Sequence, residues 1–167
     1  MDFPKVSNPK VKNFLATFFL FREINREFYN LVLESQFDFR MVDNPQRRSD
    51  SIRENLAHQI NVEKAYIESI LNGVSKFDTY KDESLKTKSK KELLKILEET
   101  DRKLIDFLSD NKNLRRKIIA KWSKKPIISF DYLWGLIHHE ILHNGINIGL
   151  MDYLNIPHSK TLKQVWG

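Results

Sequence analysis

Residues 51–73 read SIRENLAHQINVEKAYIESILNG and carry the signals of one complete helix. Ser51 and Glu54 have the spacing of a capping box, in which each side chain bonds the backbone N–H of the other residue. Gly73 suits the residue after a helix, because glycine adopts the left-handed conformation needed there without strain. Apolar residues recur between them at threes and fours, which predicts one buried face. They are Ile52, Leu56, Ile60, Ile67 and Ile70.

Three further segments carry the same kind of signal. Asn8 followed by Pro9 is typical of a helix start, and Ser89-x-x-Glu92 is a second capping box. Pro157 marks the end of the last segment. The predicted helices cover residues 9 to about 35, 89–109 and about 129–154. Four amphipathic segments of similar length predict an all-α protein with a four-helix bundle, as a single domain over residues 1–167.

The connections are less clearly specified. Residues 38–48 are polar and contain a proline, which favours a loop. KIIAKWSKKPIISF, residues 117–130, is compatible with a short β-hairpin or with an irregular excursion before the last helix. The structure of residues 110–128 stays open at this point.

Composition excludes several classes of protein. The chain has no cysteine, which excludes disulfides, a thiolate zinc site and a cysteine nucleophile, and fits a reducing compartment. The apolar run at 14–21 is followed by Arg22, Glu23 and Arg26 rather than by a cleavage site, so we interpret it as a core helix and not a signal peptide. Nothing approaches the roughly 20 apolar residues of a membrane span. We therefore expect a cytoplasmic protein without a membrane partner.

Charge is unevenly distributed along the chain. Residues 81–125 hold 15 Lys/Arg and 8 Asp/Glu, so this basic segment carries the formal excess of positive charge. Such a segment could attract phosphate, and Trp122 could stack on a base. Charges of both signs alternate there with apolar residues at helical spacing, which is typical of a solvated helix face. We do not expect nucleic-acid binding.

The motif HEILH at 139–143 has the H-E-x-x-H spacing of many zinc-binding helices. His139 and His143 lie about 40° apart around a helix, so they share a face. The apolar residues of that face are Tyr132, Leu136, Ile146 and Leu150. Both imidazoles should therefore point inward and could hold one cation. Glu140 lies about 80° away around the helix, and we expect at most an indirect contact with the metal from it.

A third ligand has to come from elsewhere. His138 is turned about 100° from His139, and His158 lies beyond the helix end, which leaves His58 by elimination. If the second and fourth helices run parallel, as alternate helices of an up-down bundle do, His58 lies about one turn from the level of the other two. The alternative is a lone histidine hydrogen-bonded at the edge of its helix.

A peptidase is the obvious rival interpretation of H-E-x-x-H. Such enzymes need a further ligand downstream, and residue 149, six positions after His143, is a glycine. No glutamate follows Glu140, and Asp152 is too far along the same helix. No convincing sheet precedes the motif. We do not favour a protease.

Residues 51–70 and 132–149 together resemble the DinB/YfiT-like family. The resemblance rests on S-x-x-E-x-x-x-H in the first window and on H-x-x-x-H-x-G in the second. It implies a four-helix bundle in which His58, His139 and His143 bind one divalent metal. The chain has His143-Asn144-Gly145-Ile146 where the commoner pattern is H-R-G-Q, so no role of that Arg or Gln carries over.

The resemblance also implies a range of activities. Some members resemble thiol S-transferases that use bacillithiol, mycothiol or glutathione, and others resemble maleylpyruvate isomerases. We expect a metal-dependent transferase or hydrolase acting on a small molecule, with Zn²⁺ or Ni²⁺ and a low-molecular-weight thiol such as bacillithiol as cofactors. The alternative is a non-catalytic metal-binding bundle that supports homodimerisation or binds a partner.

Overall fold

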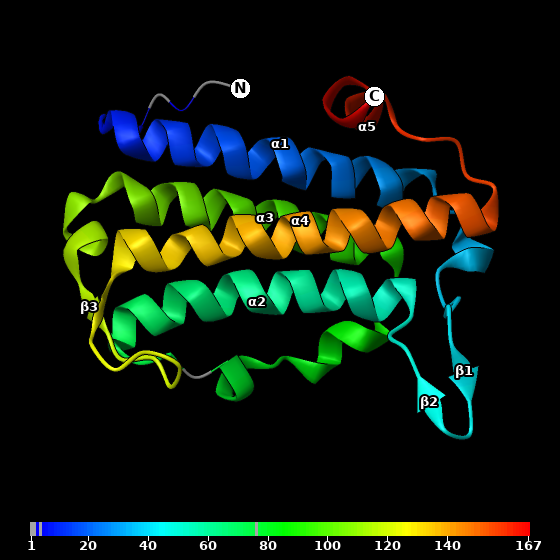
Figure 1. Cartoon of the computed structure of the whole chain (residues 1–167), viewed down its shortest axis with the longest axis horizontal. Helices are drawn as coiled ribbons and strands as arrows, with labels where there is room; N and C mark the ends of the chain where they lie inside the picture. Colours follow the sequence, from blue (N-terminus) through cyan, green and yellow to red (C-terminus); the bar gives the residue numbers. More distant parts are fainter. Residues whose placement is uncertain (1–2, 4, 76) are drawn as a thin grey trace.

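The computed structural model describes residues 3, 5–75 and 77–167. Four long helices make up most of it (Figure 1). Their bounds are α1 Pro9–Leu31, α2 Ile52–Asn72, α3 Lys90–Ser109 and α4 Ser129–Leu154. The predicted all-α class and four-helix bundle are confirmed. None of the described helices is long and apolar enough to cross a bilayer.

The helix ends follow the predicted capping chemistry. Ser51 accepts a hydrogen bond from the backbone of Glu54, whose side chain accepts one from the backbone of Ser51, and Ser89 forms the same box at α3. Gly73 ends α2 with a φ of 70°. The end of α1 was predicted too late. The chain leaves the helix at Val32, which has an extended backbone, rather than near residue 35.

The direction of the helices differs from the prediction. The support for His58 assumed that α2 and α4 run parallel, but the two helices are antiparallel. Tyr66, near the end of α2, has its ring 4.7 Å from that of Tyr132, near the start of α4, and Asn55 near the start of α2 lines one pocket with Ile146 of α4. The colours of Figure 1 show α1 and α4 running one way and α2 and α3 the other. The segment after Gly73 runs back along α2 before α3 begins, so α3 starts at the same end as α2 (Figure 1).

Short elements fill the connections. Residues 43–48 contain a hairpin of β1 (Asp43–Asn44) and β2 (Arg47–Arg48), a stretch predicted only as a loop. Of the two options left open for residues 117–130, the structure has the hairpin, with β3 (Lys117–Ile118) antiparallel to β4 (Ile127–Ile128). Four 3₁₀-helices are described, η1 Glu34–Gln36, η2 Phe77–Tyr80, η3 Glu83–Thr87 and η4 Asn111–Arg115.

A short fifth helix was not predicted. α5 (Lys160–Trp166) begins at the cap Ser159 and packs on α1, where Thr161 donates to the carboxylate of Glu27. Its seven residues hold one fully buried side chain, Leu162, which is too little periodicity to predict a helix from sequence.

The interior is apolar at both ends of the bundle and polar between them. One cluster of buried side chains surrounds Phe14 and Leu133, and another surrounds Phe28 and Leu56. Gly135 allows α2 and α4 to approach closely, because a Cβ there would lie 2.0 Å from the hydroxyl oxygen of Tyr66. On α4, His139 and His143 follow this contact by one and two helical turns.

Candidate metal centre

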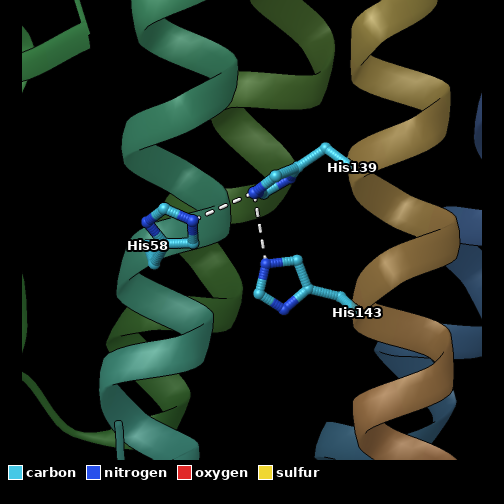
Figure 2. A group of neighbouring side chains, drawn as sticks. All are labelled: His58, His139 and His143. Carbon is cyan, nitrogen blue, oxygen red and sulfur yellow. Dashed lines mark hydrogen bonds between the residues drawn. The ribbon is translucent and has the colours of Figure 1, made fainter.

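Three histidine rings from two helices converge near the middle of the bundle. Nε2 of His58, on α2, lies 3.0 Å from Nε2 of His139, which lies 3.2 Å from Nε2 of His143 on α4 (Figure 2). One ligand atom from each ring lies within 4.8 Å of the other two. These are the three residues predicted from the sequence, and the structure brings them together.

The spacing of the nitrogens suits a small divalent cation. A tetrahedral ion with bonds of about 2.05 Å to imidazole places its ligand nitrogens about 3.3 Å apart. Two of the observed separations, 3.0 and 3.2 Å, are close to that value. Each ring directs its Nε2 toward the others, so one nitrogen per ring faces a common point (Figure 2).

The remaining histidines lie outside this group. His138 is exposed on α4, and His158 contacts Asp152 with its Nε2 2.9 Å from the carboxylate. Within the described ranges, no further histidine or carboxylate is grouped with the three rings. The elimination of these two residues agrees with the structure, although the parallel helix direction used to support His58 was wrong.

Two of the rings are held neutral. Burial, together with the neighbouring His139, lowers the pKa of His143 to about 3. Burial and His139 also lower the pKa of His58. A metal binds the neutral imidazole, so at neutral pH these rings need lose no proton before acting as ligands.

One side of the centre is open to the surface. His143 is buried, His139 is half-buried and His58 is exposed. His58 lines a surface pocket of about 160 Å³ between α2 and the connection to α3. The other lining residues are Asp50, Glu54, Ala57, Asn61, Lys81, Glu83 and Lys86. A second pocket, of about 360 Å³, lies beside the β1–β2 hairpin. It is about one turn from the histidines, toward the start of α2 and the end of α4.

The other side of the centre borders a buried group of charges. Arg22 of α1 is fully buried, with its guanidinium 2.7 Å from Glu63 of α2 and 3.3 Å from Glu140 of α4. Asp101 of α3 lies 3.5 Å from Arg22 and pairs with Arg26 at 3.0 Å. The four long helices of the bundle therefore meet through these ion pairs directly beside the histidines.

The buried carboxylates differ in protonation. Burial, only partly opposed by Arg22, raises the pKa of Glu63 well above its ordinary value, and burial raises that of Asp101. Burial also opposes ionisation of Glu140, but Arg22, His139 and Asn25 outweigh it, so its pKa is lowered. The surroundings of Glu140 thus favour its charged form, whereas burial opposes the charged forms of Glu63 and Asp101.

This charged group was missed in the sequence, although one signal was available. Arg22 and Asn25 fall within the buried stripe of α1 rather than on its solvent face, since each lies three or four residues from buried neighbours such as Phe18 and Phe28. Polar residues in an apolar stripe need buried partners. The sequence of α1 does not identify these partners, because they lie on other helices.

A family model describing the DinB superfamily matches residues 24–146. The chain belongs to the DinB superfamily. The match includes His58, His139 and His143 and most of the four long helices. A search of curated proteins finds no match for the chain.

Solved structures share the DinB fold at low sequence identity. A DinB-like protein from Bacillus subtilis, YjoA, has a TM-score of 0.64 at 17% identity, over 86% of this chain and 94% of that one. YfiT from Bacillus subtilis, described as a probable metal-dependent hydrolase with an unusual four-helix bundle topology, has a TM-score of 0.62 at 15% identity, over 85% and 87%. A mycothiol-dependent maleylpyruvate isomerase has a TM-score of 0.58 at 11% identity, over 77% of this chain and 58% of that one. These likenesses establish the fold.

Proposed function

We propose that the protein binds one divalent cation, Zn²⁺ or Ni²⁺, through His58, His139 and His143, and is a metal-dependent transferase or hydrolase acting on a small molecule. The observation that carries this proposal is the convergence of three Nε2 atoms beside a pocket that opens at His58. The descriptions of YfiT as a probable metal-dependent hydrolase and of the isomerase as mycothiol-dependent support the same class of chemistry.

The three imidazole ligands and the pocket residues determine the chemistry that this centre can support. Three neutral imidazoles leave the charge of a divalent ion uncompensated and a coordination position free, and an ion so bound acidifies a water or thiol. Asn61, Lys81 and Lys86 line the pocket at His58 together with the carboxylates of Asp50, Glu54 and Glu83, so the pocket can hold a polar substrate group. The pocket volume of about 160 Å³ suits a small molecule rather than a polypeptide.

A thiol substrate fits the composition of the chain. Because there is no cysteine, a sulfur nucleophile has to come from solution. We propose a low-molecular-weight thiol such as bacillithiol as the co-substrate, and the cytoplasm, where such thiols stay reduced, as the place of action. S-transfer to an electrophile and hydrolysis would then differ only in whether a thiol or a water occupies the free coordination position.

The first test is elemental analysis of the purified protein, followed by Zn²⁺ and Ni²⁺ titrations of the metal-free form. We expect about one ion per chain, and for His58→Ala a loss of affinity beyond the roughly 10–100-fold that outer partners of a metal site cost. His138→Ala is the matched control, since it removes an exposed histidine next to the site, and its affinity should equal that of the wild type. Equal affinities of wild type and His58→Ala would overturn the proposed site.

Activity is tested with the same proteins. Conjugation of bacillithiol or glutathione to an electrophilic probe and hydrolysis of small esters and amides are measured with the metal present and after its removal by a chelator. We expect turnover in one of the two assays that disappears with the metal and returns with it. Stoichiometric metal binding without turnover in either assay would favour the non-catalytic bundle, and the oligomeric state in solution would then test homodimerisation.

A further inference from the structure

The carboxylate of Glu140 lies between a proposed metal ligand and the buried charges. It is fully buried on α4, in the residue next to His139. Its Oε2 accepts a hydrogen bond of 2.8 Å from Nδ2 of Asn25 on α1. Its Oε1 lies 3.3 Å from Nη2 of Arg22 and 4.0 Å from Nδ1 of His139. One carboxylate oxygen therefore faces Asn25, while the other faces both Arg22 and Nδ1 of the His139 ring.

Two of these atoms lack a hydrogen-bond partner among the described residues. Nδ1 of His139 and Oε1 of Glu140 are both buried, and neither forms a hydrogen bond. A neutral imidazole that offers Nε2 to a metal carries its proton on Nδ1, so this ring has one donor left and needs an acceptor. A shift of about 1 Å would close the gap to a normal hydrogen-bond length.

Glu140 cannot easily move away from the ring. Asn25, which donates to it, accepts in turn a hydrogen bond of 2.7 Å from Asn147, so both ends of this amide are engaged. Arg22 is held by Glu63 at 2.7 Å and by Asp101. The carboxylate is therefore held through α1, α2 and α3, with its Oε1 between Arg22 and the ligand ring.

We propose that Glu140 is a positioning residue, whose Oε1 accepts the Nδ1–H of His139 and thereby fixes the tautomer and the orientation of this ring for metal binding. The inference rests on the proposed function. It gives the orphaned Nδ1 of His139 an acceptor, since metal-bound histidines usually donate their second N–H to a carboxylate, a carbonyl or a water. The rival explanation is that Glu140 only balances the charge of Arg22.

Glu140→Gln separates the two explanations. The amide oxygen can face Asn25 or His139, but not both, so in either orientation the NH₂ group meets a donor. Glu63→Gln is the matched control, because Glu63 is equally buried and also pairs with Arg22 but is not within reach of the histidine rings in any described contact. Glu140→Asp keeps the charge on a shorter side chain and tests for rescue.

The measurement is Zn²⁺ affinity of the full chain by competition with a chromophoric chelator, together with ¹⁵N NMR of the histidine rings. For Glu140→Gln we expect an affinity loss of about 10–100-fold and a weakened or lost Nδ1–H hydrogen bond of His139, because a neutral amide oxygen accepts less strongly than a carboxylate and can also turn away from the ring. Glu63→Gln should stay within about threefold of the wild type, and Glu140→Asp should recover part of the loss.

Each other outcome counts against one specific claim. Wild-type affinity and an unchanged Nδ1–H signal in Glu140→Gln would overturn this inference alone. Equal losses in Glu140→Gln and Glu63→Gln would show a merely structural effect and also overturn it. Failure of the wild-type protein to bind either Zn²⁺ or Ni²⁺ would overturn the proposed function, and this inference with it.

Discussion

Glu54 illustrates how much a single side chain contributes at the start of α2. Its Oε2 accepts a hydrogen bond of 2.8 Å from the backbone N–H of Ser51 and a second one from the guanidinium of Arg40. The bond from Arg40, together with those from Ser51, lowers the pKa of Glu54 to about 2 despite partial burial. The capping box was visible in the sequence, but the ion pair was not, because Arg40 lies in the preceding loop.

The first prediction concerns the pH dependence of this residue. The pKa of Glu54 is lower in the folded than in the unfolded chain, so its stabilisation is complete above about pH 4.5 and is lost as the pH falls toward about 2. Glu54→Gln should lower the unfolding free energy by about 1 kcal/mol at pH 7, and the difference from the wild type should vanish in that acidic range. Urea unfolding of the two metal-free proteins at a series of pH values measures this difference in unfolding free energy.

Glu92→Gln is the control for this prediction, because Glu92 caps α3 in the same way but has no arginine partner among the contacts described. Its effect should be smaller than that of Glu54→Gln. A difference between wild type and Glu54→Gln that does not change between pH 7 and pH 2 would contradict the assignment.

At the scale of the helices, the contact between α2 and α4 controls the geometry of the candidate site. Tyr66 of α2 packs against α4 over Gly135, with its ring against that of Tyr132. Gly135 lies one helical turn before His139. A larger residue at position 135 would have to displace the side chain of Tyr66, which packs between α2 and α4.

We therefore predict that Gly135→Ala lowers the unfolding free energy by about 1–3 kcal/mol through overpacking and also weakens Zn²⁺ binding. Tyr66→Phe in the same protein should recover part of both losses, because it removes the atom that the new methyl group would meet at 2.0 Å. Chemical unfolding and Zn²⁺ titration of the three proteins measure the effects.

Gly145→Ala is a matched control on the same helix, since a Cβ at that position meets nothing within 4 Å. It should be neutral or stabilising by about 0.4–1 kcal/mol, because alanine restricts the unfolded chain. Equal effects of the two substitutions would contradict the role of Gly135.

For the whole molecule, the three histidines would let one ion link α2 to α4. These helices come from distant parts of the chain, and the described part of the 73–89 connection between α2 and α3 includes the two short 3₁₀-helices η2 and η3. A ligand that binds only the folded protein stabilises it by mass action, by about 2.7 kcal/mol at a free concentration 100 times its Kd.

We predict that Zn²⁺ at this concentration raises the melting temperature by about 5–10 °C for a chain of this size. His58→Ala should lose this shift under the same conditions, whereas His138→Ala should keep it. A shift of equal size in His58→Ala would indicate that the ion binds elsewhere. Thermal melts followed by circular dichroism provide the measurement.

Local sequence determined the four long helices and two of the three proposed metal ligands. The caps Asn8, Ser51 and Ser89 begin helices where predicted, because capping involves only the next three residues. The pairing of His139 with His143 was equally accessible, since residues four apart share a helix face whatever the rest of the chain does.

The direction of the helices and the surroundings of the histidines were decided by tertiary structure. That α2 runs against α4 depends on the path of residues 73–89, which no local signal encodes, and the reach of His58 depends on the close approach at Gly135. Glu140, expected to have at most an indirect contact with the metal, is fully buried because Arg22 of α1 lies opposite it. Such partners are distant in sequence, and only packing brings them together.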